Sequence, residues 1–305
     1  MMKKEHESGQ ARMKEGRPPD GHLQGSISRR NLLMGAAALG AGSKILEAAT
    51  ASATTDPPAG KPGILALIGD RYHNADYIHV SLDRLFSEMG LAWDYTTRYE
   101  QLSRNLLRGY RVLVVFKDGM IWPGGYLGPD AYTCYEDDLE NRADFPKAKP
   151  QGWITPEQAE AVRDFVNDGN GLYSFHESCD VSNFSPVYKE LLGGEYAGHP
   201  PLRPFKVRVV NKTHPITRGI EDFMVTDEQH FPAYQGDPEN ILLQGENIDG
   251  LTYGDRGTKS VSGWAHEYGK GRVVFTGIGH TIHAMWAPEH LKLQKRAVQW
   301  LLKQI

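Results

Sequence analysis

Apolar and polar positions along residues 63–175 predict strands and helices in alternation. Apolar residues recur at helical spacing from Ile78 to Met89, and Gly90 stands where a helix C-terminal glycine belongs. Strands that are apolar at every position are typical of a parallel sheet covered on both faces. Two continuous apolar runs, Ile64–Ile68 and Val112–Phe116, have the length of such strands, and Leu172–Phe175 is predicted as a further strand. The order predicts an α/β fold with a doubly wound, mostly parallel sheet and right-handed crossovers.

Capping residues indicate where one helix in this half of the chain begins. Thr155 stands at a helix N-cap, Pro156 follows at the first helical position, and Gln158 completes a capping box. The helix that they begin is expected to end at Gly169. Before it, residues 119–152 form a loop-like insertion rich in Gly, Pro, Asp and Tyr.

The C-terminal third has a different pattern. Lys206–Val210 alternates as a half-buried strand does, and residues 260–266 and 272–276 read as two strands of a hairpin. The last apolar residues lie on one helical face between Leu293 and Leu301. We therefore expect an antiparallel C-terminal extension of the sheet within one domain, since about 250 residues still fit a single core.

The first 62 residues do not resemble the rest. The segment 28–33 reads SRRNLL, and an apolar run rich in alanine and glycine follows as far as Gly42. A basic pair before such a run is the order of a bacterial export signal, and the run is too short to cross a bilayer as a stable helix. Residues 51–53 read ASA, a small-residue cleavage site. We expect residues 1–53 to be a signal, 54–62 a linker and 63–305 the folded domain.

The arginine pair also resembles the twin-arginine signal, which its receptor reads as an address. That resemblance implies export of the folded protein by the twin-arginine machinery to a periplasmic or secreted location. No cysteine follows the apolar run, so no stable membrane anchor is expected.

Charge and cysteine content exclude several classes of protein. The chain has a net charge of −4, and residues 54–305 alone carry −7, so there is no basic excess for nucleic acid. Two cysteines, Cys134 and Cys179, cannot form a disulfide scaffold, and the sequence leaves open whether they pair. The pattern does not set the oligomeric state, and a homo-oligomer is compatible with it.

Titratable side chains follow the predicted strands at the edge where ligands bind in open α/β sheets. They are Asp70 and His73, Lys117 and Asp118, His176 and Glu177, and His280 with His283 one helical turn further. His176 follows its strand directly, where a strand-to-helix elbow presents a reactive side chain, and His280 lies in Gly277-Ile278-Gly279-His280, where glycines allow close approach to a ligand. If residues 227–230 stay extended, Glu228 and His230 point to the same face. Asp70 and Asp118 are equally well read as turn formers.

Other reactive residues have a weaker context. His79, His199, His266 and His290 are expected to be surface or structural, and His214 to shape a turn before Pro215. Cys179 lies three residues past His176, which places it poorly for a nucleophile. No pre-assembled zinc motif, GxSxG, Walker loop or GxGxxG is present, which argues against serine hydrolases, nucleotide hydrolases and dinucleotide dehydrogenases.

Several blocks in one order resemble the ThuA-like (trehalose-utilisation) family. These blocks are HPITRGI at 214–220, TDEQ at 226–229, GKGRVVFT at 269–276 with Gly279-His280, and AVQW at 297–300. The resemblance implies a flavodoxin-like fold similar to class I glutamine amidotransferases. In that comparison the elbow cysteine is replaced by His176, which argues against glutamine hydrolysis.

The resemblance also implies a function in the use of trehalose and related disaccharides, including 3-keto sugars. We expect an exported carbohydrate-active hydrolase or lyase in which His176, Glu228 and His280 supply acid–base or metal-ligand chemistry. Residues expected to bind the sugar are His73, Asp118, Glu177, His230 and Trp122, the last of these within an insertion that also contains Tyr126, Tyr132 and Tyr135. A divalent metal such as zinc is compatible with the residues, and no nucleotide cofactor is expected. The alternative is a non-catalytic carbohydrate-binding or assembly module on the same fold.

Overall fold

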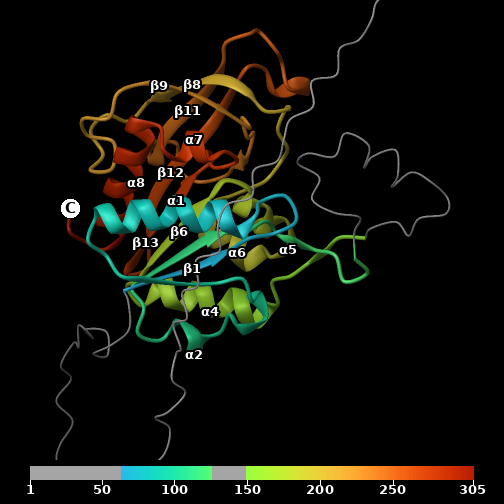
Figure 1. Ribbon diagram of the computed structural model, residues 1–305, viewed down its shortest axis with the longest axis vertical. Coiled ribbons are helices and arrows are strands. Elements are labelled where there is room, and N and C mark those ends of the chain that lie inside the picture. The colour runs from blue at the N-terminus through green and yellow to red at the C-terminus, as the bar shows by residue number, and fades with distance from the viewer. Residues whose placement is uncertain (1–62, 126–148) are drawn as a thin grey trace, which may run out of the picture. The chain divides into compact units, whose positions relative to one another are not determined.

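Residues 63–125 and 149–305 of a computed structural model are described, and they contain one nine-stranded mixed sheet (Figure 1). The strand order is β2-β1-β3-β6-β13-β12-β11-β8-β9. Five neighbouring strands are parallel: β2 (Trp93–Thr96), β1 (Ile64–Ile68), β3 (Val112–Phe116), β6 (Gly171–Phe175) and β13 (Gly271–Thr276). The remaining four are antiparallel to their neighbours: β12 (Lys259–Tyr268), β11 (Ile241–Asn247), β8 (Arg203–Val209) and β9 (Phe223–Asp227).

The parallel strands confirm the predicted fold class. Counted along the chain, their spatial order is 2-1-3-4-5, which is the flavodoxin-like doubly wound order. The antiparallel strands extend the same sheet beyond β13, as expected for a class I glutamine amidotransferase-like fold with an antiparallel C-terminal part.

Helices cover both faces of the parallel strands. Alternate residues of β1 enter two separate cores, with Ala66 facing helices α1 (Ala75–Glu88) and α8 (Pro288–Leu301), and Leu67 facing α4 (Pro156–Asn167) and α6 (Pro186–Leu192). Figure 1 shows α1 and α4 on opposite sides of the sheet. The other described helices are short: α2 (Arg104–Leu107), α5 (Val181–Phe184), α7 (Ile282–Met285) and the 3₁₀ turns η1 (Tyr99–Gln101), η3 (His176–Asp180), η4 (Pro238–Asn240) and η5 (Gly254–Arg256).

Local sequence signals account for the helix ends that were predicted. The Thr155 hydroxyl accepts a hydrogen bond from the backbone N–H of Gln158, whose side chain accepts one from the backbone N–H of Thr155, so the capping box is confirmed. Gly90 has a φ of 65°, the left-handed conformation that follows a helix end. The hairpin between β12 and β13 and the buried face of α8 are also confirmed.

The strand β11 and two small antiparallel pairs were not predicted from the sequence. These pairs are β4 (Met120–Ile121) with β5 (Gln151–Gly152), and β7 (Gly194–Glu195) with β10 (Ala233–Tyr234). No helix among the described residues has both the length and the hydrophobicity to cross a membrane. The expected signal and linker, together with Tyr126, Tyr132, Cys134 and Tyr135, lie outside the described residues.

Candidate active site

Five strands deliver titratable residues to one edge of the sheet. Because β9 is separated from β13 by three strands that reverse direction in turn, it runs the same way as the parallel strands. The carboxyl end of β9 therefore meets those of the parallel strands at the same edge. The residues that follow these ends are His73 after β1, Asp118 after β3, His176 after β6, His280 after β13 and Glu228 after β9.

His176 occupies the sharp turn between β6 and η3. Its φ of 51° is left-handed, a conformation that residues other than glycine rarely adopt. The side chain is fully buried, and its Nδ1 lies 3.0 Å from the carbonyl oxygen of Gly277. A carbonyl oxygen can only accept, so Nδ1 carries the hydrogen and Nε2 is left to face the site. The elbow predicted at this position is present.

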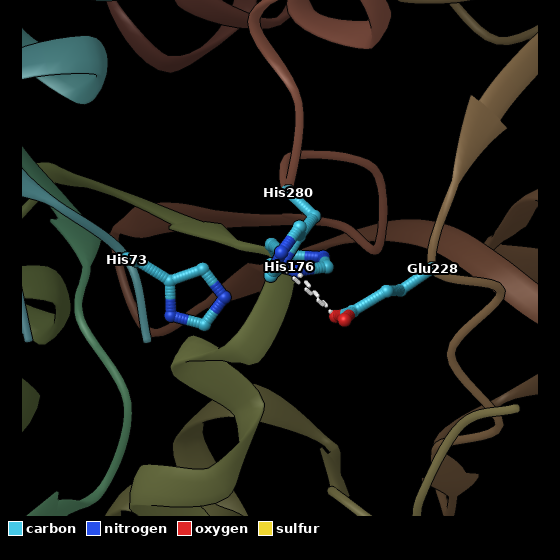
Figure 2. A group of neighbouring side chains, drawn as sticks. All are labelled: His73, His176, Glu228 and His280. Carbon is cyan, nitrogen blue, oxygen red and sulfur yellow. Dashed lines mark ion pairs between the residues drawn. The ribbon is translucent and has the colours of Figure 1, made fainter. Parts of the chain in front are cut away.

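The Glu228 carboxylate is the centre to which the histidines converge. Figure 2 shows it pointing toward His176 and His280, with the ring of His73 beside them. The distances from Glu228 Oε2 are 3.1 Å to His280 Nδ1, 3.3 Å to His176 Nε2, 3.6 Å to His199 Nε2 and 3.7 Å to His230 Nε2. Burial alone would raise the pKa of Glu228, but its close contacts with the rings of His176, His230 and His280 outweigh burial and hold the pKa far below its ordinary value.

The histidines around Glu228 differ in charge. Burial lowers the pKa of His176 and of His230, so both rings are neutral near pH 7. Burial also opposes the charged form of His280, but contact with the Glu228 carboxylate reverses this and raises its pKa. The site therefore pairs a neutral imidazole, suited to accept a proton, with a second imidazole suited to donate one.

His73 is held from behind by Asp70. Its Nδ1 lies 2.9 Å from Asp70 Oδ1, and Asp70 also accepts hydrogen bonds from the backbone N–H groups of Tyr72 and Asp118. Burial would raise the pKa of Asp70, but the neighbouring His73 lowers it overall, so Asp70 is an ionised acceptor. The Nε2 atom of His73 is buried without a hydrogen-bond partner, and the ring centroid lies 4.9 Å from that of His176.

Three buried carboxyl groups lie behind the histidines. Burial and the charge of Asp70 raise the pKa of Asp118 to about 8, and burial raises that of Asp180 to about 6. The pKa of Glu177 is also raised well above its ordinary value, first by burial and then by Asp180 and Asp118. Glu177 Oε2 lies 3.2 Å from His230 Nε2. Glu177 and Asp118 are therefore protonated near pH 7 and can donate hydrogen bonds.

The expected site residues fall into two groups. The structure brings His73, His176, Glu177, Glu228, His230 and His280 together. Asp118 contacts this group through its backbone N–H, which donates to Asp70, and the ring of Trp122 lies 5.5 Å from that of Tyr72. Their assigned roles stay predictions.

His199 also lies in the cluster, a position that was not predicted from the sequence, where His199 was expected to be surface or structural. Its ring stacks on His230 at 5.0 Å with an interplanar angle of 10°. His199 lies in the loop after β7 and follows no predicted strand, so no local signal in the sequence indicated its position.

His214, His266 and His290 have the structural places that were expected, and Cys179 is as poorly placed for a nucleophile as was expected. His290 Nδ1 donates to the carbonyl of Ala284, His266 Nε2 to that of Leu191, and His214 Nδ1 accepts from the backbone N–H of Ile216. Cys179 is a free, fully buried thiol whose pKa is raised by burial, so it is not a candidate nucleophile.

Three overlapping groups of side chains in the described part of the chain are close enough to share a metal ion. The largest consists of His73, His176, Glu228 and His280, each offering one ligand atom within 4.8 Å of the others. The two smaller groups are His176 with Glu177 and His230, and His199 with Glu228 and His230. Imidazole nitrogen with one carboxylate oxygen is a donor set for zinc and similar ions.

Comparison with known proteins identifies a family over most of the chain. The profile of the ThuA family, described as trehalose utilisation, matches residues 69–301. A search of the curated proteins gave no match.

Solved structures share the fold at low sequence identity. Two are putative ThuA-like proteins: one from Bacteroides uniformis ATCC 8492 (17% identity, TM-score 0.55, 80% of this chain and 93% of that chain) and one from Parabacteroides merdae ATCC 43184 (14%, 0.55, 80% and 91%). A β-galactosidase from Rahnella sp. R3 is similar over 80% of this chain but only 31% of its own, with 12% identity and a TM-score of 0.51. These likenesses concern the fold alone.

Proposed function

The chain belongs to the ThuA, or trehalose-utilisation, family, and from this premise we propose that it is an enzyme acting on a disaccharide or a 3-keto-glycoside. The observation that carries the proposal is the convergence of His176, Glu228 and His280, from three separate segments, on one buried point. Neighbouring titratable groups whose pKa values are shifted in opposite directions are typical of a site that transfers protons.

A 3-keto-glycoside suits this arrangement chemically. The hydrogen on the carbon next to its carbonyl is acidic, and the glycosidic oxygen leaves from the carbon beyond. His176 Nε2 accepts that hydrogen, the released electron pair forms the carbon–carbon double bond, and the glycosidic C–O bond breaks. His280 donates its proton to the departing oxygen, so the products are a free sugar and an unsaturated keto sugar. General acid–base catalysis of this kind contributes about 10²- to 10⁴-fold in rate.

Other residues are assigned to binding. Glu177 and Asp118 lie beside the cluster and are protonated near pH 7, so they can donate hydrogen bonds to sugar hydroxyl groups. His230 and His73 are the other polar side chains of the cluster that we assign to binding. Trp122 and Tyr72 bring aromatic rings to the loops at the same edge of the sheet, and such rings pack against sugar faces.

The test is an assay of the purified protein with trehalose and with 3-keto-disaccharides, following products by mass spectrometry. We expect product from the wild type and at least about a 100-fold loss of rate in the double variant His176→Ala, His280→Ala. The matched control is His283→Ala, because His283 lies three residues from His280 but is exposed on α7. Equal rates in wild type and the double variant would refute the proposal. Sugar binding without product would favour the carbohydrate-binding module instead.

Export is a separate proposal, supported by the segment SRRNLL at 28–33. We propose that the twin-arginine machinery delivers the protein to the periplasm or medium. Cell fractionation should place the wild type outside the cytoplasm and retain an Arg29→Lys, Arg30→Lys variant inside. The same distribution for both proteins would refute it.

A further inference from the structure

We infer that His73, His176, Glu228 and His280 form a binding site for one divalent transition-metal ion, with zinc as the ion that the donor set fits best. The four residues come from four different segments, which follow β1, β6, β9 and β13. The inference rests on the geometry of these side chains, and it stands whether or not the substrate is a carbohydrate. With a metal bound, the Nε2 lone pair of His176 is a ligand, so His176 can accept a proton from a substrate only in the metal-free protein.

The hydrogen bonds behind two of the rings fix which nitrogen faces the cluster. His73 Nδ1 lies against the Asp70 carboxylate, and His176 Nδ1 lies against the carbonyl of Gly277. Neither acceptor can supply a hydrogen, so both Nδ1 atoms are protonated. In a neutral ring the Nε2 atom then carries a lone pair. Both rings are buried, at 2% and 0% exposure, so the Nε2 atoms must find their partners within the protein or in a bound ion.

The Nε2 lone pairs of His73 and His176 face the same point as the Glu228 carboxylate, which is itself an acceptor. His176 Nε2 lies 3.3 Å from Glu228 Oε2, and His280 Nδ1 lies 3.1 Å from the same oxygen. The Nε2 atoms of His73 and His176 and the Nδ1 atom of His280 are buried, and none has a geometrically acceptable hydrogen bond. His73 Nε2, His176 Nε2 and the Glu228 carboxylate are acceptors that face one another, which is repulsive. A cation that takes the place of the proton on His280 Nδ1 and is coordinated by all four side chains removes the repulsion.

The spacing of the four atoms agrees with a metal site. All of them lie within 4.8 Å of one another. Metal–nitrogen and metal–oxygen bonds to zinc are about 2.0–2.2 Å, so neighbouring ligand atoms in a tetrahedral site are about 3.4 Å apart. The two distances from Glu228 match this value closely. The alternative groups around His230 offer three ligand atoms each and share His176 or Glu228 with this one, so we assign the four-residue set.

The contacts behind the rings are those that support metal ligands. Histidines that bind metals commonly donate their other ring N–H to a carboxylate or a backbone carbonyl, which fixes the ring and increases its basicity. Asp70 does this for His73, and Gly277 does it for His176. Three nitrogen donors and one carboxylate favour zinc or a similar ion over calcium or magnesium, which prefer oxygen ligands.

The test uses the full chain, stripped with a chelator and then dialysed against zinc, manganese or cobalt. We expect one bound metal per chain by mass spectrometry of the metal, a higher Tm with metal than without, and a visible Co²⁺ absorption band. Glu228→Gln, which is nearly isosteric, and His280→Gln should each lower zinc affinity at least tenfold. His283→Ala is the matched control and should bind zinc as the wild type does.

Circular dichroism of each metal-free variant establishes that it is folded before its affinity is compared. The inference is overturned if the wild type binds no more zinc than the chelator-treated blank, or if folded Glu228→Gln and His280→Gln bind zinc as tightly as the wild type. A protein that binds metal at these residues but forms no product from the sugars would leave the metal site standing and refute the proposed enzyme. Full turnover by a protein that binds no metal would refute the metal site and leave the proposed enzyme standing.

Discussion

The Asp227 carboxylate accepts a hydrogen bond of 2.7 Å from the backbone N–H of Gly279, a residue 52 positions later in the chain. Asp227 ends β9, next to Glu228, and Gly279 precedes His280 in the turn after β13. This buried bond therefore holds together the two segments whose side chains face each other in the cluster. Burial raises the pKa of Asp227 to about 6, although His176 and the bond from Gly279 oppose the shift.

Replacing Asp227 by Ala should therefore weaken both the fold and the cluster. The buried N–H of Gly279 would lose its acceptor, at a cost of about 1–3 kcal/mol in the free energy of unfolding. His280 would also lose its fixed distance to Glu228, so we expect lower activity or metal affinity. Denaturant unfolding and the zinc titration measure the two effects.

Asp227→Asn is the matched variant, because its amide oxygen can still accept from Gly279. We expect it to lose clearly less stability than Asp227→Ala. If the two variants were equally stable, the bond to Gly279 would not be what holds the segments together.

The layered part of the fold could be predicted because each element carries its own signal. Ile64–Ile68 and Val112–Phe116 are buried at every position, as their continuous apolar pattern indicated. The antiparallel strand β11 was harder to recognise. It is only half buried, and its register with β12 shifts twice between Ile241 and Gln244, so neither strict alternation nor a continuous apolar run appears in its sequence.

The site was predictable to the extent that it follows strand ends. His176, Glu228 and His280 were found by that rule, since ligands bind beyond the carboxyl ends of such strands. His199 was not, because the loop after β7 carries it to Glu228, and only the tertiary structure determines that contact. Glycine at position 279, beside His280, was expected to allow close approach to a ligand, and the packing around it gives a second reason. A Cβ on Gly279 would lie 2.7 Å from the Cβ of His176, so close packing within the protein accounts for it.

The left-handed backbone of His176 predicts an unusual order of stability. In the variants His176→Ala and His176→Gly the imidazole is lost equally, but alanine keeps the strain of a φ of 51° and glycine does not. His176→Gly should therefore be the more stable, by on the order of 1 kcal/mol. Urea unfolding of the two metal-free proteins measures the difference.

Asp83 provides the control for this comparison, since it is exposed in the middle of α1. There glycine should be worse than alanine by about 1 kcal/mol, which is the usual order in a helix. If alanine were the better residue at both positions, position 176 would not be strained.

His290 predicts a pH dependence of stability away from the cluster. It is fully buried, its Nδ1 donates to the carbonyl of Ala284, and burial lowers its pKa to about 4. The unfolded chain takes up this proton near pH 6.5, and the folded chain does not until about pH 4. Stability is therefore complete above pH 6.5, falls as the pH decreases through this window, and levels off below it. The loss should approach about 3 kcal/mol.

The variant His290→Asn isolates this contribution, because its amide can donate to Ala284 but does not titrate. Other groups also titrate between pH 4 and 6.5, so the quantity to measure is the difference in unfolding free energy between wild type and variant at each pH. That difference should change in favour of the variant as the pH falls. A constant difference would mean that His290 does not carry the predicted shift.

Two glycines in one turn give the most direct test of how the cluster is packed. At Gly279 an added Cβ would meet the Cβ of His176 at 2.7 Å and the ring of Phe116 at 2.8 Å, whereas at Gly277 the nearest atom is 3.5 Å away, an ordinary contact. Gly279→Ala must therefore displace His176 or Phe116 from its present position, at a cost of about 1–3 kcal/mol in stability. Gly277→Ala should be tolerated, although its carbonyl accepts the hydrogen bond from His176.

The two variants should separate in function as well as in stability. Gly279→Ala crowds His176 and should lower zinc affinity and turnover together, while Gly277→Ala should keep both near the wild-type values. Unfolding curves, zinc titrations and product assays on the same preparations make the comparison. If Gly279→Ala retained the zinc affinity and turnover of the wild type, the position of His176 against Glu228 would not matter to the site, and both roles assigned to His176 would fail.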